Sequence, residues 1–191
     1  LHLCDQHLSH MKAEKINTKD NLLLEVCLAA QYEGSSLVKK YKEYKERHTD
    51  LPSDICTVLA RSFADIGDII RGKDLFRGYN EIDREQKKKI QDSLKNIFGK
   101  IYEELTKNEK TNKEAAQKRY KGDPDFFKLR EDWWDANRKK VWDAITCKAG
   151  SDSQYFRATC SNGLSRASKQ CRCEVNTDPP TYFDYVPQYL R

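Results

Sequence analysis

Only a few residues in this sequence have the types and spacings that could support metal binding or catalysis. Cys4, His7 and His10 recur at three-residue steps, a spacing that zinc ligands can use. A structural zinc site needs a fourth ligand, usually from a second compact Cys/His pair, and none stands nearby. Carboxylates that could work as general acid and base form two adjacent pairs, Glu103 with Glu104 and Glu131 with Asp132. Such pairs are common on helix surfaces, so neither indicates catalysis.

No longer catalytic motif is present. The sequence has no glycine-rich phosphate loop followed by Lys-Ser/Thr, no Gly-x-Ser-x-Gly turn and no His-Glu-x-x-His. We therefore predict that the chain is not an enzyme and that it binds no metal or cofactor.

Positive charge gathers in clusters along the chain. Lys and Arg number 35 against 30 Asp and Glu, which gives a formal net charge of +5. The candidate polyanion-binding residues are Lys39, Lys40, Lys42, Lys45 and Arg47; Lys87, Lys88 and Lys89; Lys118, Arg119 and Lys121; and Arg138, Lys139 and Lys140. A further set near the last cysteines is Arg157, Arg166, Lys169 and Arg172. If clusters converge, they form a surface for a polyanion; the alternative is that each is a separate solvated face.

Seven cysteines point to disulfides and to an oxidising compartment. They are Cys4, Cys27, Cys56, Cys147, Cys160, Cys171 and Cys173. A bridge between Cys27 and Cys56 is plausible because they stand on consecutive predicted helices, but the connectivity stays open. An extracellular setting favours a sulfated glycan over nucleic acid as the polyanion. There is no apolar run long enough to span a membrane, and the chain opens on Leu1, so we expect an internal piece of a longer protein.

The hydrophobic period predicts an all-α fold, a bundle of long amphipathic helices with a disulfide-tied irregular C-terminal loop region. The predicted helices cover residues 18–30 and 37–48, as one kinked helix or two, then 53–71, 81–106 and a last one that Asp123-Pro124 begins. Asp20 is the expected cap of the first helix, and Gly72 the expected C-terminal cap of the third segment. After Lys148 the helical period stops, and no strand pattern is convincing.

The stretch from Ala60 to Phe76, Ala-Arg-Ser-Phe-Ala-Asp-Ile-Gly-Asp-Ile-Ile-Arg-Gly-Lys-Asp-Leu-Phe, carries a resemblance. It resembles the signature segment of the Duffy-binding-like domains of malaria parasites, in particular the alpha class at the head of Plasmodium falciparum erythrocyte membrane protein 1. Three further segments agree in order: Leu1–Cys4, Trp142–Cys147 and Asp184–Arg191. The resemblance implies one helical subdomain over residues 1–191, the middle one of a domain, with 1–17 and 181–191 as junctions to neighbouring subdomains.

The resemblance also implies a function. Members are adhesins on the surface of the infected erythrocyte, anchored by a transmembrane segment outside this piece. The alpha class is associated with rosetting through heparan-sulfate-like chains, blood-group sugars or complement receptors. Ala60–Phe76 is carried over as core, and no family motif transfers binding residues, so the basic clusters rest on charge alone. We therefore predict a module that binds host receptors, with sulfated glycans or blood-group sugars as ligands. The alternative is a helical scaffold whose surface varies antigenically while neighbouring subdomains or domains make the contacts.

Overall fold

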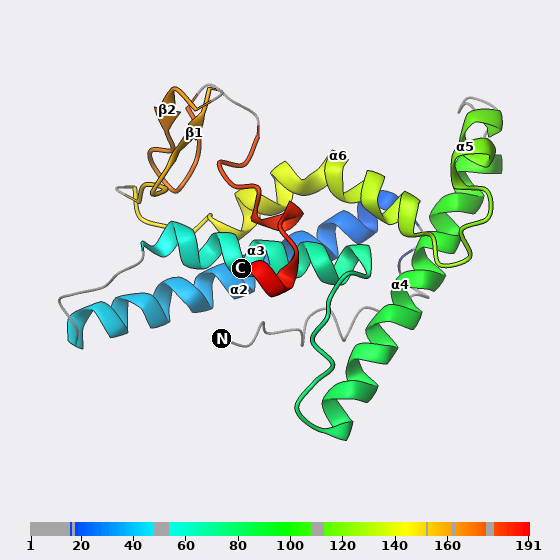
Figure 1. Ribbon diagram of the computed structural model, residues 1–191, viewed down its shortest axis with the longest axis horizontal. Coiled ribbons are helices and arrows are strands. Elements are labelled where there is room, and N and C mark those ends of the chain that lie inside the picture. Colours follow the sequence, from blue (N-terminus) through cyan, green and yellow to red (C-terminus); the bar gives the residue numbers. More distant parts are fainter. Residues whose placement is uncertain are drawn as a thin grey trace. The chain divides into compact units, whose positions relative to one another are not determined.

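The computed structural model describes residues 16, 18–47, 54–107, 113–151, 153–161, 163–174 and 178–191 (Figure 1). The candidates Cys4, His7 and His10, and most of the predicted junction at 1–17, lie outside these residues. Five α-helices dominate the described ranges: α2 (Lys19–Arg47), α3 (Ile55–Arg71), α4 (Glu81–Lys107), α5 (Lys113–Tyr120) and α6 (Phe127–Ile145). The all-α prediction is confirmed. None of the described helices is long and apolar enough to cross a membrane.

The remaining elements are short and lie toward the C-terminus. Strands β1 (Ala158–Cys160) and β2 (Ser165–Arg166) pair antiparallel, and two 3-10 helices follow at Phe183–Tyr185 and Gln188–Leu190. The strands were not predicted, because two or three residues are too few to show an alternating pattern. The helix α5 was not predicted either, since none of its residues is buried and no apolar stripe marks it.

Two compact units share the chain. The first combines Cys27–Gly67 with Arg138–Arg191, and the second combines the segment ending at Val26 with Asp68–Asn137. The expectation of one helical subdomain over residues 1–191 stays a prediction.

In the first unit, α3 supplies the centre of the core. Leu59 and Phe63 are fully buried, as the apolar stripe predicted, and the Phe63 ring meets Trp142 of α6 edge to face at 5.2 Å. The helix α2 passes close to the end of α6 at Gly34. A Cβ built on Gly34 would lie 1.9 Å from the backbone oxygen of Ile145, so only glycine allows this approach. Gly34 thus serves the packing of α2 against α6 and does not end the helix, so α2 is one continuous helix from Lys19 to Arg47.

Two disulfides fix the irregular region of the first unit. Cys56 at the start of α3 bonds to Cys171, and Cys160 of β1 bonds to Cys173. The suggested Cys27–Cys56 bridge is therefore wrong: the buried Cys56 faces the loop after β2 rather than α2. Among the described cysteines, Cys27 and Cys147 are unbonded, and burial raises the pKa of the Cys27 thiol.

Two helix starts differ from the prediction. Thr18, not Asp20, caps α2, because its Oγ1 accepts a hydrogen bond from the Asn21 N–H at 3.2 Å. The helix α6 begins at Phe127 rather than at Pro124. The Asp123 carboxylate accepts the Lys128 N–H at 2.7 Å, so the acidic cap acts from four residues before the helix.

In the second unit, α4 buries an apolar stripe of residues at helical spacing, although Leu105 at its end is only half-buried. Ile90, Leu94, Ile97 and Ile101 are all 3% exposed or less. The neighbouring Phe98 ring contacts Trp133 of α6 edge to face, at 6.1 Å between centroids. This packing holds α4 and the start of α6 together and so positions the side chains described next.

Candidate functional site

The helix α3 ends in a glycine cap that leads into an extended connector. Gly72 has a φ of 73°, which favours glycine, and the predicted cap is confirmed. Its N–H donates to the Ile69 carbonyl at 3.2 Å, while the Lys73 N–H donates to the Asp68 carbonyl at 2.8 Å. These are the two bonds of a Schellman motif. Residues 73–79 then alternate between exposed and half-buried side chains, as an extended chain does.

The connector, the first half of α4 and the start of α6 line a pocket of about 570 Å³ in the second unit. Its cationic lining residues are Arg77, Arg84, Lys87, Lys88, Lys95 and Arg130. Its carboxylates are Asp74, Asp92 and Asp125, and its apolar side chains include Ile69, Phe76, Ile90 and Phe127. We call it the basic pocket, because six cations face three carboxylates there.

Two of the lysines are neutralised within the pocket. Lys87 forms an ion pair with Asp74, and its Nζ lies 4.6 Å from the centroid of the Phe76 ring. Lys95 pairs with Asp125 at 2.7 Å between Nζ and Oδ1. The Lys87 pair is mostly buried, so this lysine holds the connector against α4 and has little charge left for a ligand.

Three of the lining cations are exposed: Arg77, Arg84 and Lys88, which we call the rim cations. Within the described ranges, none of the three lies within ion-pair distance of a carboxylate. Arg84 donates from Nε to the carbonyl of Asn80 at 3.3 Å, which leaves its charge unbalanced. Asp92 also lines the pocket, so the three rim cations share it with one carboxylate outside the Lys87 and Lys95 pairs.

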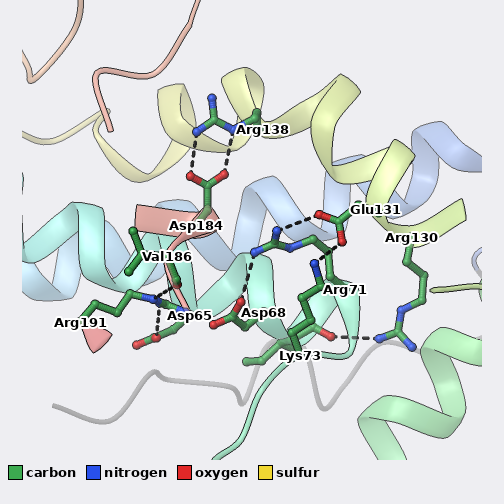
Figure 2. A network of polar contacts seen from close by, with 11 residues as sticks. Asp65, Asp68, Arg71, Lys73, Arg130, Glu131, Arg138, Asp184, Val186 and Arg191 are labelled. Carbon is green, nitrogen blue, oxygen red and sulfur yellow. Dashed lines mark hydrogen bonds and ion pairs between the residues drawn. The ribbon is translucent and has the colours of Figure 1, made fainter. Parts of the chain in front are cut away.

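Arg130 forms the floor of the pocket and is only 2% exposed. Its Nε donates to the Ile70 carbonyl at 2.6 Å, and its Nη2 donates to the Ile69 carbonyl at 3.0 Å and to Gln91 Oε1 at 2.7 Å. Figure 2 shows the guanidinium turned toward the end of α3. Burial lowers the pKa of Arg130 to about 10, against the raising effect of nearby carboxylates, so it stays charged at neutral pH.

An ion-pair network lies beside this floor (Figure 2). Arg71 donates to Asp68 at 3.1 Å and to Glu131 at 3.0 Å, and Lys73 pairs with Glu131 at 2.5 Å. Burial alone would raise the pKa of Glu131, but the hydrogen bonds from Lys73 and Arg71 outweigh it and hold the pKa below its usual range. Glu131 is thus fixed as a carboxylate partner of two cations, which is a structural role.

Comparisons with known proteins decide the family. The profile of the Duffy binding domain matches residues 1–191, the whole chain. The chain belongs to the Duffy binding domain family.

Solved structures of this family resemble the chain closely. The NTS-DBL1(alpha-1) domain of the Plasmodium falciparum membrane protein PfEMP1, varO strain, is 40% identical with a TM-score of 0.77, over 99% of this chain and 40% of that one. An ICAM-1-binding DBLbeta domain of PfEMP1 is 33% identical with a TM-score of 0.67, over 99% of this chain and 39% of that one. A PfEMP1 DBLb domain bound to human ICAM-1 is 32% identical with a TM-score of 0.60, over 100% of this chain and 34% of that one.

These findings confirm the resemblance seen in the sequence. The chain spans about 40% of the length of the DBL1-alpha chain that it matches. The comparison with curated proteins gives no match.

The structure of this Duffy binding domain brings only part of the predicted cationic set to one place. Lys87 and Lys88 line the basic pocket, while Lys89 is exposed on α4 outside its lining. On α5 and the following turn, the predicted cations are exposed: Lys118, Arg119 and Lys121, of which Arg119 pairs with Asp132 at 2.5 Å. The cationic residues exposed on the last turns of α2, in the first unit, are Lys39, Lys40, Lys42, Lys45 and Arg47.

Arg138 does not lie on the surface, although its place in the predicted cationic cluster with Lys139 and Lys140 required it to. Arg138 is 5% exposed: its Nε and Nη2 donate to the two carboxylate oxygens of Asp184 at 2.8 and 2.7 Å, and Nη2 also donates to the Thr181 carbonyl (Figure 2). Burial would lower the pKa of Arg138, but the Asp184 carboxylate outweighs it and raises the pKa. Arg138 is therefore a core cation. Its neighbour Lys139 pairs with Asp143, and Lys140 alone is exposed.

Four lining cations were absent from the predicted set: Arg77, Arg84, Lys95 and Arg130. None of the four is adjacent to another cation in the sequence, so none belongs to a run of basic residues. The spacing of Arg84, Lys88 and Lys95 by four and seven residues along one helix face was a usable signal. Nothing in the sequence shows that Arg130 approaches the end of α3.

Proposed function

We propose that the chain is part of an adhesion module of the PfEMP1 kind, displayed on infected erythrocytes, which binds receptors on host cells. Family membership over the whole chain supports this, as do the two ICAM-1-binding relatives. Binding rather than catalysis follows from the same family. For the chain itself we propose an anionic carbohydrate ligand, such as a sulfated glycan of the heparan type. The chain is more similar to the DBL1-alpha domain than to the ICAM-1-binding DBLbeta domains, and the resemblance to the alpha class implies such a ligand.

The observation that carries the glycan proposal is the set of rim cations. Arg77, Arg84 and Lys88 line one pocket, and no carboxylate of the described chain pairs with them. An exposed cation without an ion-pair partner can bind a sulfate group without first breaking an ion pair within the protein. By contrast, Lys87 and Arg119, which were also candidates, already have carboxylate partners.

Heparin binding across a salt series tests this proposal. We expect the apparent affinity to fall linearly with salt on logarithmic axes, because each contacted anion releases counterions. The double reversal Arg84→Glu with Lys88→Glu is expected to reduce the salt slope by about two, one for each lost contact.

The matched control is Lys42→Glu with Lys45→Glu, which makes the same change of charge on exposed positions of α2. It is expected to lower the affinity much less. Equal losses in the two variants would show that net charge alone attracts heparin. A pocket variant that binds like the wild type, or a wild type that does not bind at low salt, would contradict a glycan site here and favour a scaffold role.

A further inference from the structure

We infer that the floor of the basic pocket recognises one oxyanion, a carboxylate or a sulfate, carried on a sugar ring, through Nη1 of Arg130. This deepens the proposed function and rests on it. The glycan proposal requires only that rim cations attract a polyanion. The present inference adds a specific contact beneath them, with a defined ligand chemistry and a defined protein atom.

The first argument is that no carboxylate of the described chain forms a direct ion pair with Arg130, although Asp125 and Asp123 act on it from a longer distance. Its three hydrogen bonds go to two carbonyls and one amide oxygen, all neutral acceptors. No carboxylate of the described chain lies within ion-pair distance of its guanidinium. A buried cation usually has a paired anion, as Arg138 has in Asp184. An anion in the pocket would supply this missing charge.

The second argument is that Nη1 remains available. Arg130 uses Nε and Nη2 for its hydrogen bonds, and Nη1 donates to no described residue. Gly72 lies beside this group: a Cβ built there would lie 3.1 Å from Nη1 and 2.6 Å from Cε1 of Phe127. Gly72 therefore packs closely against the Arg130 guanidinium and the Phe127 ring, and no larger residue at position 72 would leave Nη1 in its present place.

The third argument concerns the body of the ligand. Phe76 and Phe127 line the same pocket as the cations, and the Phe127 ring lies 5.5 Å from the Arg130 guanidinium carbon. Aromatic faces pack against the C–H faces of sugar rings, whereas an inorganic anion has no C–H groups that could make this contact. A volume of about 570 Å³ suits a small organic ligand and not a long stretch of polymer. The rim cations would then contact further anionic groups of the same glycan.

The experiment uses two small probes, glucosamine 6-sulfate and methyl glucuronide, which present the two oxyanions on comparable rings. Titration into the chain labelled with ¹⁵N-arginine is followed by NMR at the side-chain resonances of Arg130. We expect one of the probes to shift the Arg130 Nε resonance with saturation at millimolar concentration, and the stronger binder identifies sulfate or carboxylate.

A variant locates the contact. Gln91→Glu places a carboxylate 2.7 Å from Nη2 of Arg130 and supplies the missing counter-charge from within the protein. We expect it to weaken binding of the small probe about tenfold, since one unit charge close to the site opposes the ligand. Gln86→Glu is the matched control, because it makes the same change at an exposed position of α4 outside the pocket lining, and it is expected to change the affinity little.

The outcomes separate the two proposals. If heparin binds but neither probe shifts Arg130 in the wild type, the floor contact is wrong while the rim cations keep their role. If neither heparin nor the probes bind, both proposals fail together. The wild-type titration needs no variant, so the inference can be contradicted even if Gln91→Glu folds poorly after losing the bond from Gln91 Nε2 to the Ile69 carbonyl.

Discussion

Arg138 depends on a single carboxylate for its charge balance. Both oxygens of Asp184 accept hydrogen bonds from its guanidinium, and both side chains are buried. We predict that Asp184→Asn lowers the free energy of unfolding by about 3–5 kcal/mol, because it leaves a buried cation without its counter-charge. Urea denaturation measures this. Glu103→Gln, which breaks the exposed pair with Lys107, is the control, and there we expect no measurable change. Equal effects at both sites would contradict the argument.

The lowered pKa of Glu131 makes the free energy of unfolding depend on pH. Its pKa is lower in the folded chain than in the unfolded chain, so it contributes stability above the unfolded value of about 4.3 and loses it as the pH falls through the folded value. In Glu131→Gln we expect unfolding free energies below those of the wild type at pH 7, by about 1 kcal/mol or less because the carboxylate is partly exposed. The two curves should converge toward pH 3. Denaturant midpoints from pH 3 to 7 test this, and parallel curves would exclude Glu131 as the cause.

At the scale of elements, the contact between α2 and α6 in the first unit depends on Gly34. Alanine inside a helix normally adds about 1 kcal/mol of stability over glycine. Here the added Cβ would meet the backbone oxygen of Ile145 at 1.9 Å, so the helices must separate. We expect Gly34→Ala to lower the unfolding free energy by at least about 1–3 kcal/mol, as overpacking does. Thermal melts compare it with Ser36→Ala, a half-buried position of the same helix, where stability should change little. A Gly34→Ala variant that matches or exceeds wild-type stability would show that the helices do not approach this closely.

The sequence predicts elements whose own periodicity defines their buried face. The stripes of α3 and α4 are of this kind, since Leu59 and Phe63 in one and Ile90 and Leu94 in the other point inward at helical steps. Helix α5 has no such face, so it could not be found. The start of α6 was placed too early because Asp123-Pro124 resembles a helix start, although the chain makes a further turn before Phe127.

The sequence predicts site residues only where neighbours along the chain determine their surroundings. Lys87 and Lys88 were found because they are adjacent, but the partner that neutralises Lys87 lies in the connector at Asp74. Whether a cation faces solvent is settled by residues far along the chain: Arg138 meets Asp184, 46 positions later. No local pattern shows such contacts, which is why Arg138 was mistaken for a surface residue and Arg130 was overlooked.

At the scale of the whole molecule, the two disulfides should differ in what they contribute. Cys56–Cys171 closes 115 positions of sequence, whereas Cys160–Cys173 closes only 13. A cross-link stabilises mainly by restricting the unfolded chain, and the effect grows with the logarithm of the loop length. The longer loop should therefore contribute ~2 kcal/mol more.

The double variants Cys56→Ala/Cys171→Ala and Cys160→Ala/Cys173→Ala test this difference, since each removes the same atoms and leaves no new thiol. We expect the first pair to lose ~2 kcal/mol more in unfolding free energy, measured with urea. The first pair also holds the loop whose Cys171 carbonyl accepts the Trp142 Nε1–H at 3.1 Å, so its loss should expose the indole and shift its fluorescence toward longer wavelength. If both pairs lose the same amount, native contacts around the short loop outweigh chain entropy. A fluorescence shift confined to the second pair would mean that the Cys160–Cys173 bond positions the loop.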